Sequence, residues 1–181
     1  MDLGIQFLNI FLPILYISCI FWYGIRFFNP ETDQQRRCRI LLRITLLAHL
    51  GFLLLLGLNY GRLPMANLYE ALGFLAFATC SVYVFLERRE DEESAGLFIL
   101  AFVFLFQTIS SAFVTHTEEI PEILSGWTFA IHVITALMSS ASLAISAVFS
   151  AMYLMLYKQM KSHRFGIIYD RLPSLDVLGT L

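Results

Sequence analysis

The chain has 181 residues, of which 58% are hydrophobic and only 14% are charged, with a mean hydropathy of +0.71. Soluble domains are usually about 45–50% apolar and about 25% charged, so this composition excludes an ordinary water-soluble protein and places the chain in a membrane. The formal net charge is −2, and we expect membrane lipid but no nucleic acid as a partner.

Five segments approach or exceed the roughly 20 apolar residues that a helix needs to cross a bilayer core. They are Leu3–Phe28, Ile40–Leu58, Leu68–Leu86, Ala95–Val114 and Trp127–Tyr157. None shows the period-2 alternation of a barrel strand, so the sequence predicts an all-α, polytopic transmembrane helical bundle. Residues 1–157 would form the bundle, and residues 158–181 would form a cytoplasmic tail or link.

The lysines and arginines predict how the bundle is oriented. Of the twelve, only Arg62 falls on one side of the predicted membrane; the others lie around the loops after the first and third segments and in the tail. Positive residues favour the cytoplasmic side, so the N-terminus should be outside and the C-terminus cytoplasmic. The run from Glu87 to Glu93 mixes both charges and is expected to be a solvated turn.

Two histidines fall inside the predicted membrane segments, where ionisable groups are costly and usually have a partner. His49 lies in the middle of the second segment. It is either a neutral imidazole hydrogen-bonded to a serine or a carbonyl, or a ligand to a buried metal or haem. His132 lies five residues beyond Trp127, an interfacial residue type, and carries the same two alternatives.

Two further patterns have packing explanations. Ser142, Ser146 and Ser150 repeat every four residues, a small-residue stripe that lets another helix approach closely. In "GRLPMANLYEALGF" (61–74), Asn67 and Glu70 have the spacing of a helix N-cap and its capping-box partner, and Tyr69 suits an interfacial aromatic belt. The cysteines form no CxxC or CxxCH motif, so neither a disulfide framework nor covalently attached haem is expected.

The surroundings of these residues resemble a known family. "LPMANLYEALGFLAF" is similar to the PxSNLYESLxFLxW segment of the CcsA/HemX-type cytochrome c assembly family, with Ala66 in place of the usual Ser. "IPEILSGWTFAIHV" resembles its VPxLQSxWLxxHV segment, and "LPSLDVLGTL" is a weaker match. The resemblance extends from about Arg39 to Leu181.

The resemblance implies a function and a set of site residues. It implies non-covalent binding of haem b and its presentation at the outer face of a bacterial inner membrane, for attachment to apocytochrome c. His132 would be an axial iron ligand at the outer face and His49 an intramembrane ligand. Trp127, Tyr69 and Glu70 would lie beside the haem, and no catalytic residue is assigned.

The family's tryptophan-rich segment, WGxxWxWD, does not occur in this sequence, whose two tryptophans are Trp22 and Trp127. A missing C-terminal half or a partner subunit would therefore supply that segment and the second ligand of each haem. The chain would then be a split, truncated or divergent member, and part of a haem lyase system without a catalytic site of its own. The alternative is a non-catalytic scaffold subunit of a respiratory or assembly complex, with the serine stripe as its packing surface.

Overall fold

The computed structural model describes residues 3–29, 34–90, 94–114, 126–162 and 172. Five helices make up this part of the chain: α1 (Leu3–Phe28), α2 (Gln35–Tyr60), α3 (Leu68–Glu90), α4 (Gly96–Phe113) and α5 (Trp127–Ser162). Each is long and apolar enough to cross a membrane, and no strand occurs in the described ranges. The prediction of an all-α bundle with five membrane helices is confirmed.

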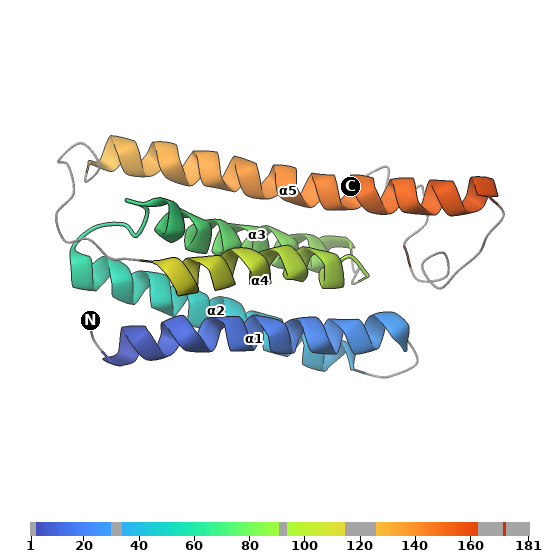
Figure 1. Cartoon of the computed structure of the whole chain (residues 1–181), viewed down its shortest axis with the longest axis horizontal. Helices are drawn as coiled ribbons and strands as arrows, with labels where there is room; N and C mark the ends of the chain where they lie inside the picture. Colours follow the sequence, from blue (N-terminus) through green and yellow to red (C-terminus); the bar gives the residue numbers. More distant parts are fainter. Residues whose placement is uncertain (1–2, 30–33, 91–93, 115–125, 163–171, 173–181) are drawn as a thin grey trace.

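Several helices run beyond the predicted apolar segments. α2 begins at Gln35 rather than Ile40, and α5 continues to Ser162 rather than Tyr157. Helical hydrogen bonds do not require apolar side chains, so a helix extends through polar residues until its backbone is interrupted. At about 1.5 Å per residue, α5 is roughly 54 Å long, against a bilayer core of about 30 Å. Figure 1 shows it reaching past the ends of its neighbours.

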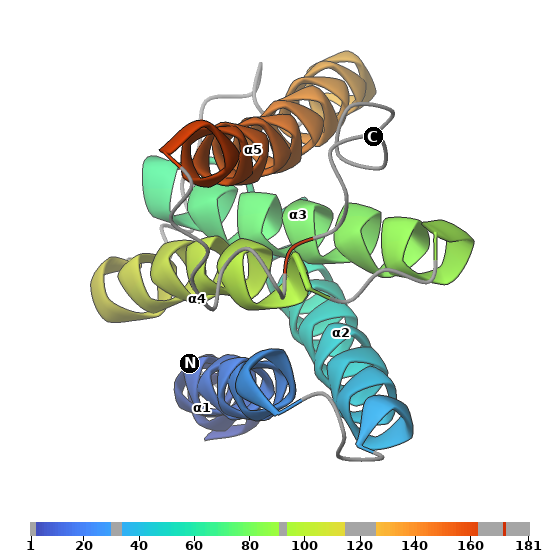
Figure 2. The same ribbon diagram turned by 90° about the vertical axis from the view of Figure 1, so that its right-hand side faces the viewer.

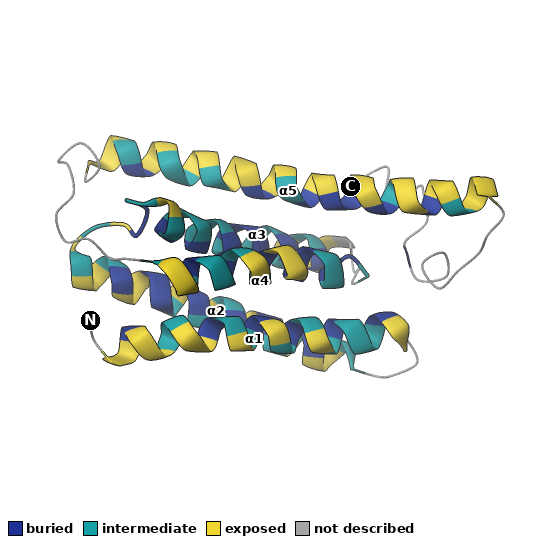
Figure 3. Ribbon diagram, in the orientation of Figure 1, coloured by how far each residue is buried: buried dark blue, intermediate teal, exposed yellow. Residues whose placement is uncertain are grey.

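The helices lie in three layers. α3 and α4 pack most extensively on each other and form the middle layer (Figure 2). α1 and α2 cover one side of this pair, while α5 rests on α3 and barely touches α4. Colouring by burial shows the buried residues facing the inside of the bundle and the exposed ones facing outward (Figure 3). An outer surface rich in Leu, Ile and Phe suits contact with lipid.

The two ends of the bundle differ in composition. We call the end that holds the turn 61–67 and the start of α5 the Trp127 end, and the opposite end, where α2 begins, the Arg36 end (Figure 1). Arg62 lies at the Trp127 end, whereas the last turns of α1, α3 and α5 place basic residues at the Arg36 end. The orientation expected from the basic residues, with the N-terminus outside and the C-terminus cytoplasmic, stays a prediction. The tail after residue 162 lies almost wholly outside the described residues.

Candidate functional site

The turn that joins α2 to α3 is built from local signals. α2 ends at Tyr60, and Gly61 follows with φ +62°, a left-handed conformation that glycine adopts without a steric penalty. The Glu70 backbone N–H donates to Asn67 Oδ1 at 2.8 Å. This is the N-cap bond expected from the sequence, and it satisfies one of the free donors at the start of α3.

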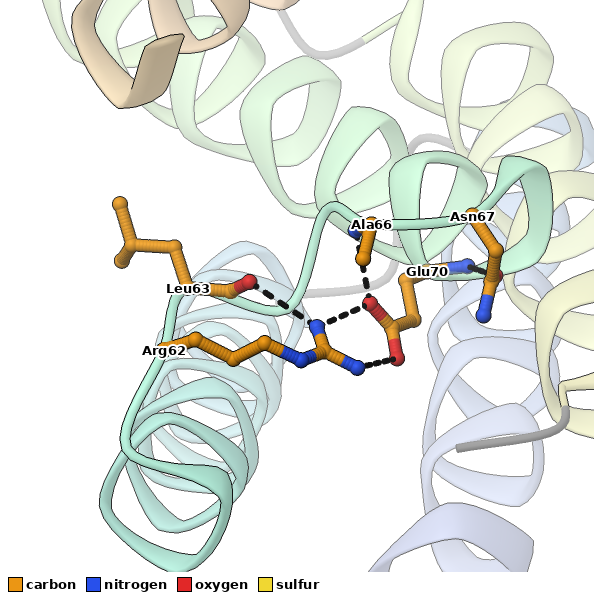
Figure 4. A network of polar contacts seen from close by, with 5 residues as sticks. All are labelled: Arg62, Leu63, Ala66, Asn67 and Glu70. Atoms are coloured by element: carbon orange, nitrogen blue, oxygen red, sulfur yellow. Dashed lines mark hydrogen bonds and ion pairs between the residues drawn. The ribbon is translucent and has the colours of Figure 1, made fainter. Parts of the chain in front are cut away.

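A buried ion pair closes this turn (Figure 4). Arg62 donates from Nη1 to Glu70 Oε2 at 2.8 Å and from Nη2 to Glu70 Oε1 at 3.0 Å. The Ala66 N–H also donates to Glu70 Oε2, at 2.9 Å, so the carboxylate caps one residue earlier than in the usual capping box. The side chains of Arg62 and Glu70 are only 6% and 1% exposed. Two-point pairing with a carboxylate is the geometry that arginine favours, so Glu70 holds the turn together.

Sequence reasoning did not identify Arg62 as the partner of Glu70. The sequence held only a weak signal for this pair. Arg62 is the one basic residue predicted on its side of the membrane, and it precedes Glu70 by eight positions in a turn that contains Gly61 and Pro64.

The same turn borders a hollow on the surface, which we call the α2–α5 groove. Its volume is about 390 Å³. It is lined by Leu53, Leu54, Gly57 and Leu58 of α2, by Gly61, Arg62 and Leu63 of the turn, and by Trp127 and Ala130 of α5. The volume and the mostly apolar lining of this groove are typical of a site that binds a small molecule. The groove thus joins the turn to the start of α5, two regions far apart in the sequence.

The two aromatic residues predicted to lie beside the haem point in different directions. The Tyr69 ring packs against Phe113 of α4, with 5.8 Å between centroids, and does not line the groove. Trp127 lines the groove and is 79% exposed at the first residue of α5. Of the two, only Trp127 is available to a ligand in the groove.

His132 lies on the outer surface of α5. Its side chain is exposed and is not part of the groove lining. The small residues that follow it on this side of the helix, Ala136, Ser139, Ser146 and Ser150, are exposed as well. The predicted serine stripe therefore does not pack against any other part of the described chain, and His132 lies on the same side of α5, nearer to Trp127.

His49 has the opposite surroundings. It is fully buried in α2, and its Nδ1 shares a 2.8 Å hydrogen bond with the Tyr16 hydroxyl of α1. The rings of Phe52 and Phe77 pack beside it. Its other ring nitrogen, Nε2, has no hydrogen-bond partner in the described part of the chain. The partner is thus a tyrosine, not the serine or carbonyl that the sequence suggested, and a tyrosine inside an apolar run gave no signal for this pairing.

Glu87 corrects another expectation. It was predicted to lie in a solvated turn, but it is buried and accepts hydrogen bonds from Tyr23 at 2.5 Å and Tyr83 at 3.3 Å. The reason is that α3 continues to Glu90, which keeps Glu87 one turn from Tyr83, where the Tyr23 side chain of α1 reaches both of them. A Cβ at Gly96 would overlap both tyrosines, so the start of α4 closes over this cluster.

The described residues contain no group of three or more His, Cys, Asp or Glu side chains placed to hold a bare metal ion. Haem iron needs only one or two axial ligands from protein. His132 fits this role because its imidazole is open to a ligand from outside the bundle. His49 offers a ring nitrogen without a partner among the described residues, but it is fully buried against Tyr16, Phe52 and Phe77 and lines none of the three hollows described here.

Comparison with known proteins gives a family match. The pattern that defines the family described as "Cytochrome C assembly protein" matches residues 65–179. That range includes Tyr69, Glu70, Trp127 and His132, whereas His49 and Arg62 precede it. No solved structure matches this chain.

Curated relatives carry the same family name or a related one. The chain is 27% identical to the cytochrome c biogenesis protein CcsA of Heterosigma akashiwo, over 84% of this chain and 48% of that protein. It is 29% identical to protein HemX of Brevibacillus brevis, over 91% of this chain and 61% of HemX. For CcsA of Pyropia yezoensis the identity is 25%, over 93% and 55%. The chain thus spans about half the length of the curated relatives it matches.

Proposed function

Because the chain belongs to the cytochrome c assembly protein family, we propose that it presents haem at the Trp127 end of the bundle for attachment to apocytochrome c. The observation that carries this proposal is the exposure of His132 on α5, within the region that matches the family. A neutral imidazole in that position can bind iron approaching from outside the bundle.

The residues around His132 have separate tasks. His132 would hold the iron, and Trp127 would offer its exposed ring to the haem. The Arg62–Glu70 pair would act indirectly, by keeping the turn 61–67 in place at the end of the α2–α5 groove. When bound, haem b supplies the macrocycle that cysteines of the apocytochrome join through thioether bonds. His49, enclosed by the bundle, would bind iron only after its neighbours repack.

The proposal requires a second component. His132 would supply one iron ligand, and the tryptophan-rich segment does not occur in this sequence. A further part of the protein, or a partner subunit, would supply both, and the match to about half of each relative supports this division. The multi-pass membrane location follows from the fold and the family. A bacterial inner membrane stays a prediction, because the relatives include plastid proteins.

The test is co-expression of the chain with the component that carries the tryptophan-rich segment and with an apocytochrome c. We expect His132→Ala to abolish the haem absorption bands of the purified complex and the yield of mature cytochrome. Imidazole added to that variant should restore the bands. Thr135→Ala, an exposed neighbour one turn away on α5, serves as the matched control and should behave as wild type. Unchanged haem and cytochrome in His132→Ala would refute the ligand assignment.

The exposed serine stripe favours a second candidate, a membrane scaffold without a haem ligand. Ser142, Ser146 and Ser150 are exposed and face away from the other described helices, so a helix of another subunit can approach them closely. In that case Ser146→Leu should abolish co-purification of the partner while His132→Ala leaves it intact. Ala151→Leu makes a similar change at another exposed position of α5 and should have no effect.

A further inference from the structure

A second hollow lies at the Arg36 end, away from the groove and both histidines. It has a volume of about 470 Å³ and is lined by Gln35, Arg36, Arg39, Ile40 and Arg43, all from the first turns of α2. None of the described residues that line it is acidic. The hollow therefore presents positive charge to whatever occupies it.

Helical spacing explains why these residues share one side of α2. Arg36, Ile40 and Arg43 are four and three positions apart and fall on the same face. Leu47 and Leu54 continue that face toward the Trp127 end, and they are 66% and 57% exposed. α2 packs on α1 and α3 only, so no described helix covers this face. The face combines a basic end, from Arg36 to Arg43, with an apolar track about two turns long from Leu47 to Leu54.

The positive-inside rule explains why arginines gather at this end, but it does not explain the hollow. Arg37 shows the difference: it is exposed on the same turn of α2 but does not line the hollow. Guanidinium groups bind phosphate oxygens in a two-point geometry, and basic pockets beside transmembrane helices bind anionic lipid head groups. An apolar track directly below the charges is what an acyl chain of the same lipid would contact.

We propose that this face of α2 is a binding site for an anionic phospholipid. Arg36 and Arg43 hold its phosphodiester, with Arg39 beside them, and an acyl chain follows Leu47 and Leu54. The head-group site does not depend on haem or on the proposed function, because its arginines lie at the opposite end of the bundle; the acyl track reaches the α2–α5 groove only at Leu54.

The experiment uses the full chain purified in detergent, with bound lipid counted by native mass spectrometry during titration with phosphatidylglycerol or phosphatidylcholine. We expect tighter binding of phosphatidylglycerol, and about a five-fold loss of affinity for each of Arg36→Gln and Arg43→Gln. Arg37→Gln removes the same charge from the same turn and should leave the affinity unchanged. Circular dichroism verifies that all variants remain helical.

Two further arms distinguish the ligand. Leu47→Asn should weaken phosphatidylglycerol binding, because it places an amide against the acyl chain. Inorganic phosphate at millimolar concentration should compete only weakly with the lipid. Equal losses for Arg36→Gln and Arg37→Gln would overturn the site in favour of general electrostatic attraction. Equal affinity for both lipids, or full displacement by phosphate alone, would also overturn it.

Discussion

His49 and His132 both lie on membrane-crossing helices, yet their surroundings in the bundle are opposite. His49 is fully buried and hydrogen-bonded to Tyr16, while His132 is exposed on α5. The difference comes from the number of neighbours that each helix has. α2 packs on two helices, whereas α5 rests almost entirely on α3. A helix with one neighbour leaves most of its circumference open, so α5 is the element on which this chain can offer residues to a ligand or partner.

The same contrast applies to the carboxylates and small residues. Glu70 and Glu87 are enclosed and fully engaged with Arg62, Tyr23 and Tyr83, so their roles are structural. The serines of α5 bond mostly to their own helix: Ser139 and Ser142 donate to the carbonyls of Thr135 and Met138. Substitutions at enclosed positions should therefore reduce stability, and substitutions on the open face of α5 should affect binding instead.

The largest loss of stability is expected from Glu70→Ala. It leaves the buried Arg62 guanidinium without its carboxylate, which costs about 3–5 kcal/mol of unfolding free energy. Reversible unfolding in mixed micelles, followed by circular dichroism, measures it. The double variant Arg62→Leu, Glu70→Leu removes both charges and should be less damaging than Glu70→Ala alone. If Glu70→Ala unfolds like the wild type, the ion pair does not hold the turn.

Removing the imidazole of His49 should have the next largest effect. His49→Leu leaves the buried Tyr16 hydroxyl with only the weakly bonding Cys80 thiol beside it, at a cost of about 1–3 kcal/mol. Adding Tyr16→Phe removes the poorly satisfied hydroxyl and should recover part of that loss in a double-mutant cycle. Additive losses in the cycle would mean that the two side chains do not interact as their 2.8 Å separation indicates.

Glycines can test how tightly the enclosed core is packed. Gly96→Ala would push a methyl group into Tyr23 and Tyr83 and is expected to cost about 1–3 kcal/mol. Gly51→Ala has no atom within 4 Å of the new Cβ, so it should be neutral or stabilising by up to about 1 kcal/mol through helix propensity. The order of the two melting temperatures is the measurement. A Gly96→Ala protein as stable as Gly51→Ala would contradict the close contact at the start of α4.

The smallest change in stability is expected for His132→Ala. Its side chain is exposed, so the unfolding free energy should stay within about 0.5 kcal/mol of wild type in the same micelles. Haem bands and cytochrome yield in the co-expressed complex should nevertheless fall. A loss of stability as large as that of His49→Leu would mean that His132 is a core residue and that α5 is not an open element.

Much of the fold could be predicted from the sequence because its signals are short-range. Long apolar runs locate the five helices, and Asn67 caps α3 through a bond that spans three residues. The helix ends were predicted less accurately, since polar stretches extend two helices beyond their apolar runs: residues 35–39 come before the run of α2, and residues 158–162 come after that of α5. For the site, the sequence and its family resemblance predicted His49 and His132 as haem ligands. The physical argument was the same for both, since each is an ionisable residue inside a predicted membrane helix.

By itself, the sequence determined that this is a membrane protein with five helices and two intramembrane histidines, because composition and local spacing are properties of the chain alone. Only the tertiary structure decided which histidine is enclosed, that Glu87 is buried, and that Arg36 lines a hollow while Arg37 does not. These outcomes depend on which side of each helix meets a neighbour. Packing between segments far apart in the sequence determines which side that is. Turning a helix about its axis by the angle of one residue is enough to move a side chain from an inward to an outward position.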